Sequence, residues 1–354
     1  MERPEVDKLT VRTQEVLDRI KTLLKDRGIS NIETSPPETF QRPILGMAQT
    51  EGARENISVV MKELGLDTES LVTIEKRVVN FSESVADGPL AGRFPDRTES
   101  QELVLYSFPP SKEHEGSSAP IVIFSHGGAI RPETSLKSPF LATIRAQAES
   151  AGNPFILATM DHRGSESDEN KVNYSLEDRV ADVEVATQAI IDGVLPDYKK
   201  LGINWNGEVI LIGNSMGGHV AAVAAGELQP DRLILPQPAA YSEESHTLPF
   251  GEDFSTAIRK KSSWKTSPAF DSLETYMRGG GKALIIGAER DEVIPGSVTK
   301  RYIKEVTYNY VSRATQATGN ETYEVGYMYI PEVHVKTTKD EISRISSFAS
   351  ANNS

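Results

Sequence analysis

The chain of 354 residues contains no cysteine, and this absence excludes several kinds of chemistry. Disulfide bridges, a thiolate nucleophile and cysteine-ligated metal centres all need a residue that is missing here. Long apolar runs are missing too, because no segment approaches the roughly 18 residues that a membrane-spanning helix requires. The acidic N-terminal stretch has no apolar core of a signal peptide, so a cytoplasmic protein is expected.

Positive charge is also in deficit. The 38 basic residues face 51 acidic ones, which gives a net charge of −13 and argues against nucleic acid or an anionic membrane as a partner. No H-E-x-x-H motif, paired aspartate cluster or phosphate-binding P-loop occurs, so no metal and no cofactor is expected. Hydrophobic residues make up 38% of the chain, enough for a sizeable globular core.

From residue 70 onward, short apolar runs alternate with helical stretches. This alternation is typical of a mostly parallel sheet with helices on both faces, so an α/β fold is predicted for residues 70–354. Eight strands are expected, at residues 72–80, 102–107, 120–125, 155–160, 208–212, 232–235, 283–287 and 323–330. The aromatic-rich segment 236–281, between the sixth and seventh strands, is expected to form a short cap.

Residues 1–69 are predicted to form an N-terminal helical extension. Apolar residues recur at helical spacing over 5–27 and about 52–64, and a proline-containing connector joins the two stretches. Either the two helices pack their apolar stripes on the main domain, or they form a lid or the contact of a homodimer.

The segment 208–218 carries the strongest chemical signal. A short apolar strand leads into Gly-Asn-Ser-Met-Gly at 213–217 and then into an alanine-rich helix. This is the spacing and context of a nucleophile elbow, in which a strained turn presents a serine above the end of a strand. The pattern makes Ser215 the candidate nucleophile.

A second strand ends in His-Gly-Gly-Ala at 126–129. In acyl-transfer enzymes the loop after this strand and the residue after the nucleophile each supply a backbone N–H to the oxyanion hole. The expected donors are therefore Gly128, or Ala129, and Met216. Glycine suits the position because the backbone must approach the substrate closely.

A serine alcohol needs a base, and the chain contains six histidines. Around such an elbow the order along the chain is serine, then acid, then histidine. His334 follows the last expected strand and satisfies this order, so it is the predicted base, with His246 on the cap as its rival. Asp291, after the seventh strand, is the predicted acid; its rivals are Glu289, Glu292, Glu243 and Glu244.

With these motifs in place, the region from about 70 to 350 resembles the α/β-hydrolase family of serine esterases, lipases and related peptidases. Residues 161–167 look like that family's D-x-R-G-x-G-x-S signature, with Glu166 where glycine is usual, and 291–295 match its Asp-x-x-hydrophobic-Pro. His334 lacks the family's usual preceding glycine. The resemblance implies an α/β-hydrolase fold and a Ser-His-Asp triad.

Three other polar positions are expected to be structural. His219 is expected to pack near the elbow, and Asp161 and Arg163 to brace the adjacent loop. Asp178 and Asp182 lie four residues apart on one helical face, a pattern typical of a solvated face.

The sequence thus predicts a serine hydrolase that cleaves a small-molecule carboxylic ester through an acyl-enzyme. Peptide or amide hydrolysis, thioester cleavage and acyl transfer use the same triad and remain alternatives. A binding protein that kept the fold and lost the chemistry is the non-enzymatic alternative.

Overall fold

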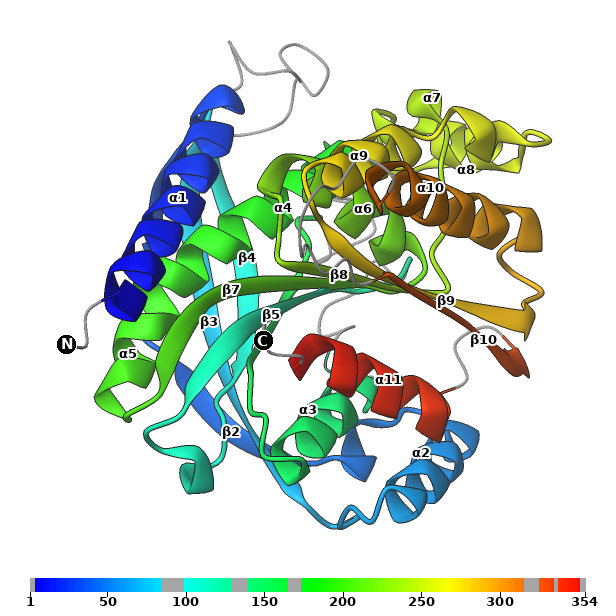
Figure 1. Ribbon diagram of the computed structural model, residues 1–354. Coiled ribbons are helices and arrows are strands. Elements are labelled where there is room, and N and C mark those ends of the chain that lie inside the picture. The colour runs from blue at the N-terminus through cyan, green and yellow to red at the C-terminus, as the bar shows by residue number, and fades with distance from the viewer. Residues whose placement is uncertain are drawn as a thin grey trace.

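The computed structural model describes residues 4–84, 99–128, 136, 139–164, 173–314, 325–333 and 337–350. One sheet crosses the middle of the molecule with helices on both of its faces (Figure 1). Within the described ranges the sheet has ten strands: β1 (Ile29–Thr34), β2 (Glu38–Pro43), β3 (Leu71–Glu83), β4 (Ser100–Phe108), β5 (Ser118–Ser125), β6 (Ile156–Asp161), β7 (Asn204–Gly213), β8 (Arg232–Pro236), β9 (Lys282–Arg290) and β10 (Val325–Val333).

Six of these strands run parallel, in the spatial order β6-β5-β7-β8-β9-β10. On the β6 side, β4 and then β3 extend the sheet by antiparallel pairing, and both β1 and β2 pair antiparallel with β3. Parallel strands are stable only where helices cover both faces, and β5, β6 and β8 are accordingly buried along almost their whole length. The predicted α/β architecture with a mostly parallel sheet is confirmed.

The predicted number of eight strands is wrong, because the sheet has ten. The eight expected strands correspond to β3–β10, and the two additional ones, β1 and β2, lie where a connector is expected. Most side chains of β1 and β2 are exposed or half-exposed, since both strands lie at the edge of the sheet beside β3. An edge strand that buries little leaves no apolar run in the sequence, and its pairing is decided by the neighbouring strand.

The described helices are α1 (Pro4–Asp26), α2 (Glu51–Glu63), α3 (Phe140–Ser150), α4 (Leu176–Ala189), α5 (Leu195–Lys200), α6 (Met216–Leu228), α7 (Glu243–His246), α8 (Glu252–Arg259), α9 (Pro268–Arg278), α10 (Gly296–Ala314) and α11 (Lys339–Ser350). Among these, α1, α4, α6, α9 and α10 form a contiguous layer on one face, while α2, α3 and α11 lie on the other (Figure 1). None of the described helices has the length and apolarity that crossing a bilayer requires.

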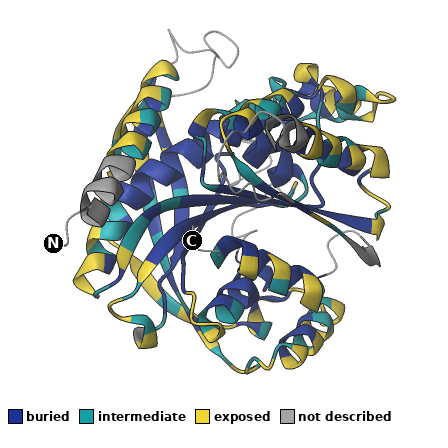
Figure 2. Ribbon diagram, viewed as in Figure 1, coloured by how far each residue is buried: buried dark blue, intermediate teal, exposed yellow. Residues whose placement is uncertain are grey.

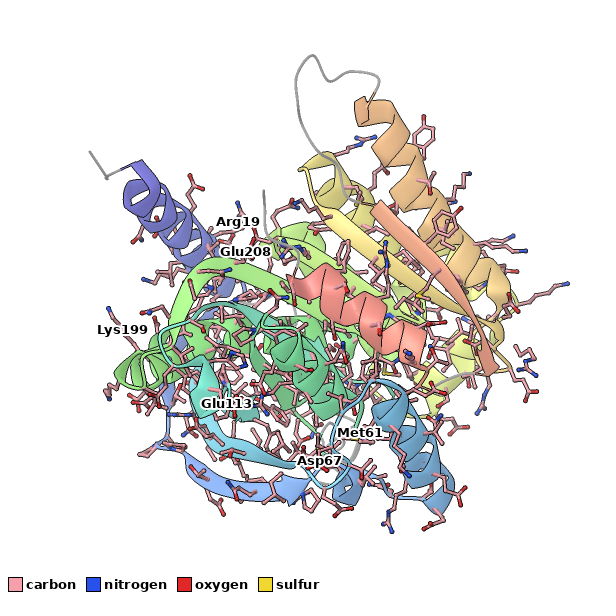
Figure 3. The ribbon with its side chains drawn as sticks, turned by 60° about the horizontal axis from the view of Figure 1, so that its bottom comes forward. Arg19, Met61, Asp67, Glu113, Lys199 and Glu208 are labelled. Atoms are coloured by element: carbon pink, nitrogen blue, oxygen red, sulfur yellow. The ribbon has the colours of Figure 1, made fainter. Side chains whose placement is uncertain are left out.

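The two layers enclose separate apolar cores. One core joins Leu24 of α1, Val180 of α4 and Val220 of α6 to one face of the sheet. The other joins Met61 of α2 and Ile345 of α11 to the opposite face, which Figure 3 turns toward the viewer. Figure 2 shows the result: the central strands are buried, and the outward sides of the helices are exposed.

The local sequence of helix α10 does not favour a helix. Its sequence is rich in β-branched and aromatic residues, which have low intrinsic helix propensity. Val298, Tyr302 and Val306 are nevertheless spaced by four residues and are all buried against the core. Packing of this stripe therefore outweighs the local preference.

The N-terminal segment shares the sheet and the core of the rest of the chain. Besides the pairing of β1 and β2 with β3, the guanidinium of Arg27 contacts the buried carboxylate of Glu184 on α4 and that of Glu227 on α6, each at 2.7 Å. Arg19 donates from Nη1 to Leu228 O at 2.9 Å. The apolar stripe of α1 thus packs on the main domain, the first of its two expected roles.

The cap segment 236–281 contributes α7, α8 and α9. Its aromatic side chains Phe250, Phe254, Phe270 and Tyr276 are all buried in the core shared with α4 and α6. They therefore pack the segment onto the body of the protein, whereas Tyr241 and Trp264 are partly exposed.

Candidate active site

Ser215 lies at the apex of the turn between β7 and α6, with φ 54° and ψ −118°. A positive φ is unusual for a residue other than glycine, so the backbone here is strained and must be held by its surroundings. Ser215 N donates to Pro236 O at 3.2 Å, and Ser215 O accepts bonds from Gly218 N at 2.9 Å and Ala239 N at 2.8 Å. The strand, turn and helix expected around a nucleophile elbow are all present.

The two glycines of the motif are required by close packing. A Cβ on Gly213 would collide with the carbonyl oxygen of Gly217, and one on Gly217 would collide with the carbonyl oxygens of Ser125 and His126. Since these obstacles are backbone atoms, no side-chain rotation could relieve the collisions. Gly217 therefore lets the start of α6 lie directly against the end of β5.

The loop after β5 lies beside the elbow. A Cβ built on Gly127 would be 3.3 Å from Ser215 Cβ, and one built on Gly128 would be 3.3 Å from Met216 Cε. The structure thus brings together Ser215, Met216 and the glycine pair, as the expected oxyanion hole requires. The alternative donor, Ala129, lies outside the described residues.

Asp291 directly follows β9 and is half-buried. Its Oδ1 accepts hydrogen bonds from Val293 N at 2.9 Å and Ile294 N at 2.8 Å, which hold the carboxylate at the carboxyl end of the strand. The rivals Glu289 and Glu292 are exposed. These backbone bonds distinguish Asp291 as the oriented carboxylate of this loop.

His334 lies outside the described residues. The strand before it, β10, pairs in parallel with β9, and Val333 is opposite Arg290 in the register. In the sequence, His334 follows Val333 and Asp291 follows Arg290. The pairing of β10 with β9 is thus described up to the residues that immediately precede these two candidates.

The remaining candidates have other partners. His246 is hydrogen-bonded through Nδ1 to His219 Nε2 at 3.0 Å, and burial lowers the pKa of His246 to about 4. Glu243 and Glu244 are exposed on α7, where Glu244 forms an ion pair with Lys260 at 2.7 Å. His219 is buried and packs against Tyr241, in agreement with its expected structural role.

Beneath the glycine loop lies a buried hydrogen-bonded relay of Ser125, His162 and Asp182, which the sequence did not predict. His162 Nδ1 donates to Asp182 Oδ2 at 3.1 Å, and Ser125 Oγ donates to His162 Nε2 at 3.2 Å. All three side chains are buried, so this Ser-His-Asp set is closed to substrate. Because Ser125 immediately precedes the residues at 126–128, the relay anchors the start of the glycine loop.

The expected solvated face at Asp178 and Asp182 is wrong, because both carboxylates are buried. Burial acts to raise the pKa of Asp182, but the charge of Arg163 and the bond from His162 lower it to about 2. Arg163 also forms an ion pair with Glu83 at 2.7 Å, which confirms its expected bracing role. The signal for this network is the pair of acids four residues apart on a helix that follows Asp-His-Arg-Gly.

No protein-family model matches the sequence, and no curated protein matches it. Solved structures do match. Esterase 2 of Thermogutta terrifontis with bound propionate is 18% identical over 72% of this chain and 90% of its own, with a TM-score of 0.45. A fungal esterase of Rhizomucor miehei is 13% identical over 84% of this chain and 88% of its own, with a TM-score of 0.49.

A further match is the Thermogutta enzyme phosphonylated by sarin, which is 16% identical over 72% of this chain and has a TM-score of 0.46. These structural neighbours are described as esterases. At these scores, the roles of individual residues must be argued from the geometry of this chain alone.

Proposed function

We propose that the protein is a serine hydrolase that cleaves carboxylic esters, with Ser215 as nucleophile, His334 as base and Asp291 as the acid that orients it. The observation that carries the proposal is the strained φ of Ser215 together with the glycine loop packed against Ser215 and Met216. Strained backbone of this kind persists only where the surrounding structure enforces it, and it is concentrated at active sites.

In the proposed mechanism Ser215 Oγ bonds to the carbonyl carbon while its proton passes to His334. The π electron pair moves onto the carbonyl oxygen, where the backbone N–H groups of Gly128 and Met216 stabilise it. The alcohol leaves with the proton from His334, which produces an acyl-enzyme. Water then gives a proton to His334 and attacks the acyl carbon, and Ser215 leaves with that proton.

Labelling with a fluorophosphonate probe tests the nucleophile, since only an activated serine reacts with it. We expect the label on Ser215, and we expect Ser215→Ala to lower the turnover of a p-nitrophenyl ester by about 10⁴–10⁶-fold. Ser118→Ala is the matched control, because Ser118 is exposed at the other end of β5. A label on Ser125 would overturn the assignment and point to the buried relay instead.

The bond that is cleaved needs a separate comparison. Esters, thioesters and aminoacyl amides of the same acyl group, assayed side by side, separate an esterase from a thioesterase or an aminopeptidase. An aminopeptidase needs carboxylates to bind a free amine, and Glu244 is already paired with Lys260. We therefore expect the ester to have the largest kcat/KM.

A further inference from the structure

Arg179, in the first turn of α4, is buried and forms no ion pair with a carboxylate of the described residues. Its Nη1 lies 3.2 Å from Met216 Sδ, and its Cζ lies 4.8 Å from the ring centroid of Phe250. Its Nε and Nη2 are buried and have no hydrogen-bond partner in the part of the chain that the structure describes. Such an arrangement is unusual, because buried charges are normally paired.

The other buried arginines of the described chain all have an acidic partner: Arg77 contacts Asp197 at 2.9 Å, Arg145 contacts Glu149 at 2.9 Å, Arg163 contacts Glu83 at 2.7 Å and Arg232 contacts Glu208 at 3.3 Å. Two acids of the same helix, Asp178 and Asp182, are both in ion pairs with Arg163.

This isolation has an energetic consequence. Burial lowers the pKa of Arg179 to about 10, with the charge of Asp182 acting in the opposite direction, so the guanidinium is still positive at neutral pH. An unpaired cation in the interior destabilises the folded protein. Buried charged groups with strongly shifted pKa values are concentrated at functional sites.

The position of Arg179 identifies that site. The side chain of Met216 contacts Arg179 through Sδ, and its Cε lies close to Gly128. Arg179 is therefore one side chain removed from the two expected oxyanion donors. Its charge also contributes, after burial and His162, to lowering the pKa of His126 on the glycine loop, so its field reaches this loop.

We propose that Arg179 is a positioning residue whose buried positive charge stabilises the oxyanion formed during acyl transfer. This inference rests on the proposed function. The missing counter-charge is the one that the carbonyl oxygen acquires when Ser215 Oγ bonds to the carbonyl carbon and the π electron pair moves to oxygen. In a site of low dielectric constant, a fixed charge acts on this oxygen without touching it.

The test compares Arg179→Met, which removes the charge but keeps an unbranched stem, with Arg179→Lys, which keeps the charge. We expect Arg179→Met to lower kcat/KM for neutral p-nitrophenyl butyrate by about 10- to 100-fold, less than the loss of a direct oxyanion donor. Its Tm should stay unchanged or rise, because an unpaired buried charge has been removed. Arg179→Lys should retain most of the activity.

Arg145→Met is the matched control, since Arg145 is also buried but is paired with Glu149 on the opposite face of the sheet. It should lower the Tm and leave kcat/KM unchanged. A second readout is the pH profile: without the positive charge, the base that accepts the Ser215 proton should titrate at a higher pH in Arg179→Met. A purely structural role of Arg179 would leave the pKa of this base unchanged.

Wild-type kcat/KM in Arg179→Met would overturn the inference, and so would a joint loss of activity and Tm in both Arg179 variants. A defect confined to an ester that carries a carboxylate, such as mono-p-nitrophenyl glutarate, would also overturn it and assign Arg179 to substrate binding. Failure of the proposed function is distinguished by Ser215→Ala, which would then keep full activity whatever the result at Arg179.

Discussion

At the scale of single residues, the elbow depends on glycines, because a Cβ atom at these positions would collide with neighbouring backbone atoms. Gly217 allows α6 to start within contact of the β5 carbonyls, and the same contact places Met216 beside Gly128. The strained φ of Ser215 is held by bonds to Pro236, Gly218 and Ala239. One added methyl group would therefore act on the nucleophile and on the oxyanion donors together.

We expect Gly217→Ala to lower both stability and activity, because its Cβ would meet the carbonyl oxygens of Ser125 and His126. The destabilisation should be about 1–3 kcal/mol, the usual range for overpacking, and kcat/KM should fall at least tenfold. Gly52→Ala is the control: on α2 its Cβ would meet nothing within 4 Å, so a gain of about 0.5–1 kcal/mol is expected. Denaturant unfolding and ester turnover measure both variants, and an active, stable Gly217→Ala protein would contradict the packing argument.

At the scale of elements, two histidines connect the cap segment to the nucleophile helix. His246 ends α7 and bonds to His219 of α6, whose Nδ1 also lies 3.3 Å from Ser267 Oγ at the start of α9. Burial lowers the pKa of His219 well below its usual value and that of His246 to about 4. Both rings are therefore neutral in the folded protein near pH 6.

This neutrality predicts a dependence of stability on pH. In the unfolded chain these two histidines take up protons near pH 6.5, whereas in the folded protein His246 does so only at about pH 4 and His219 only well below its usual pKa. Unfolding therefore binds protons in this window, and the Tm should fall as the pH is lowered from 6.5 to 4. In His246→Asn the slope of Tm against pH should be smaller than in the wild type. An unchanged slope in His246→Asn would contradict the prediction.

At the scale of the whole molecule, the described residues of 1–69 contribute to both apolar cores of the remaining chain. Helix α1 contributes Ile20 and Leu24 to the core around α4 and α6, and β1 and β2 cover the edge of β3. Arg27 is also the ion-pair partner of the buried Glu184. The N-terminal extension therefore covers surface that the rest of the chain would otherwise expose.

We expect residues 70–354 expressed alone to aggregate or to lack a cooperative thermal transition, because an apolar face and an open strand edge would be exposed. Residues 4–354 are the control and should unfold cooperatively at the Tm of the full chain. Circular dichroism and size-exclusion chromatography check both proteins. A monomeric, cooperatively folded 70–354 would show that residues 1–69 are a separate addition.

The sequence determined the parts whose signal is local. Short apolar runs predicted β3–β10, and the central parallel strands such as β5, β6 and β8 are apolar on both faces because helices cover both. The glycines at 213 and 217 predicted the elbow because only a residue without a Cβ fits there, and helices α1 and α2 follow from their amphipathic spacing.

The remaining features of the fold and the site depend on contacts between residues that lie far apart in the chain, so they become apparent only in the folded protein. The polar segments β1 and β2 form strands because their backbones pair with the edge of β3. Asp182 is buried because Arg163 and His162, about twenty residues earlier, converge on its carboxylate. Arg179 could not be singled out in the sequence, because Asp178 and Asp182 of its own helix are seen to pair with Arg163 only in the folded molecule. Burial and pairing are properties of the packed molecule, and they set the energies of these charges.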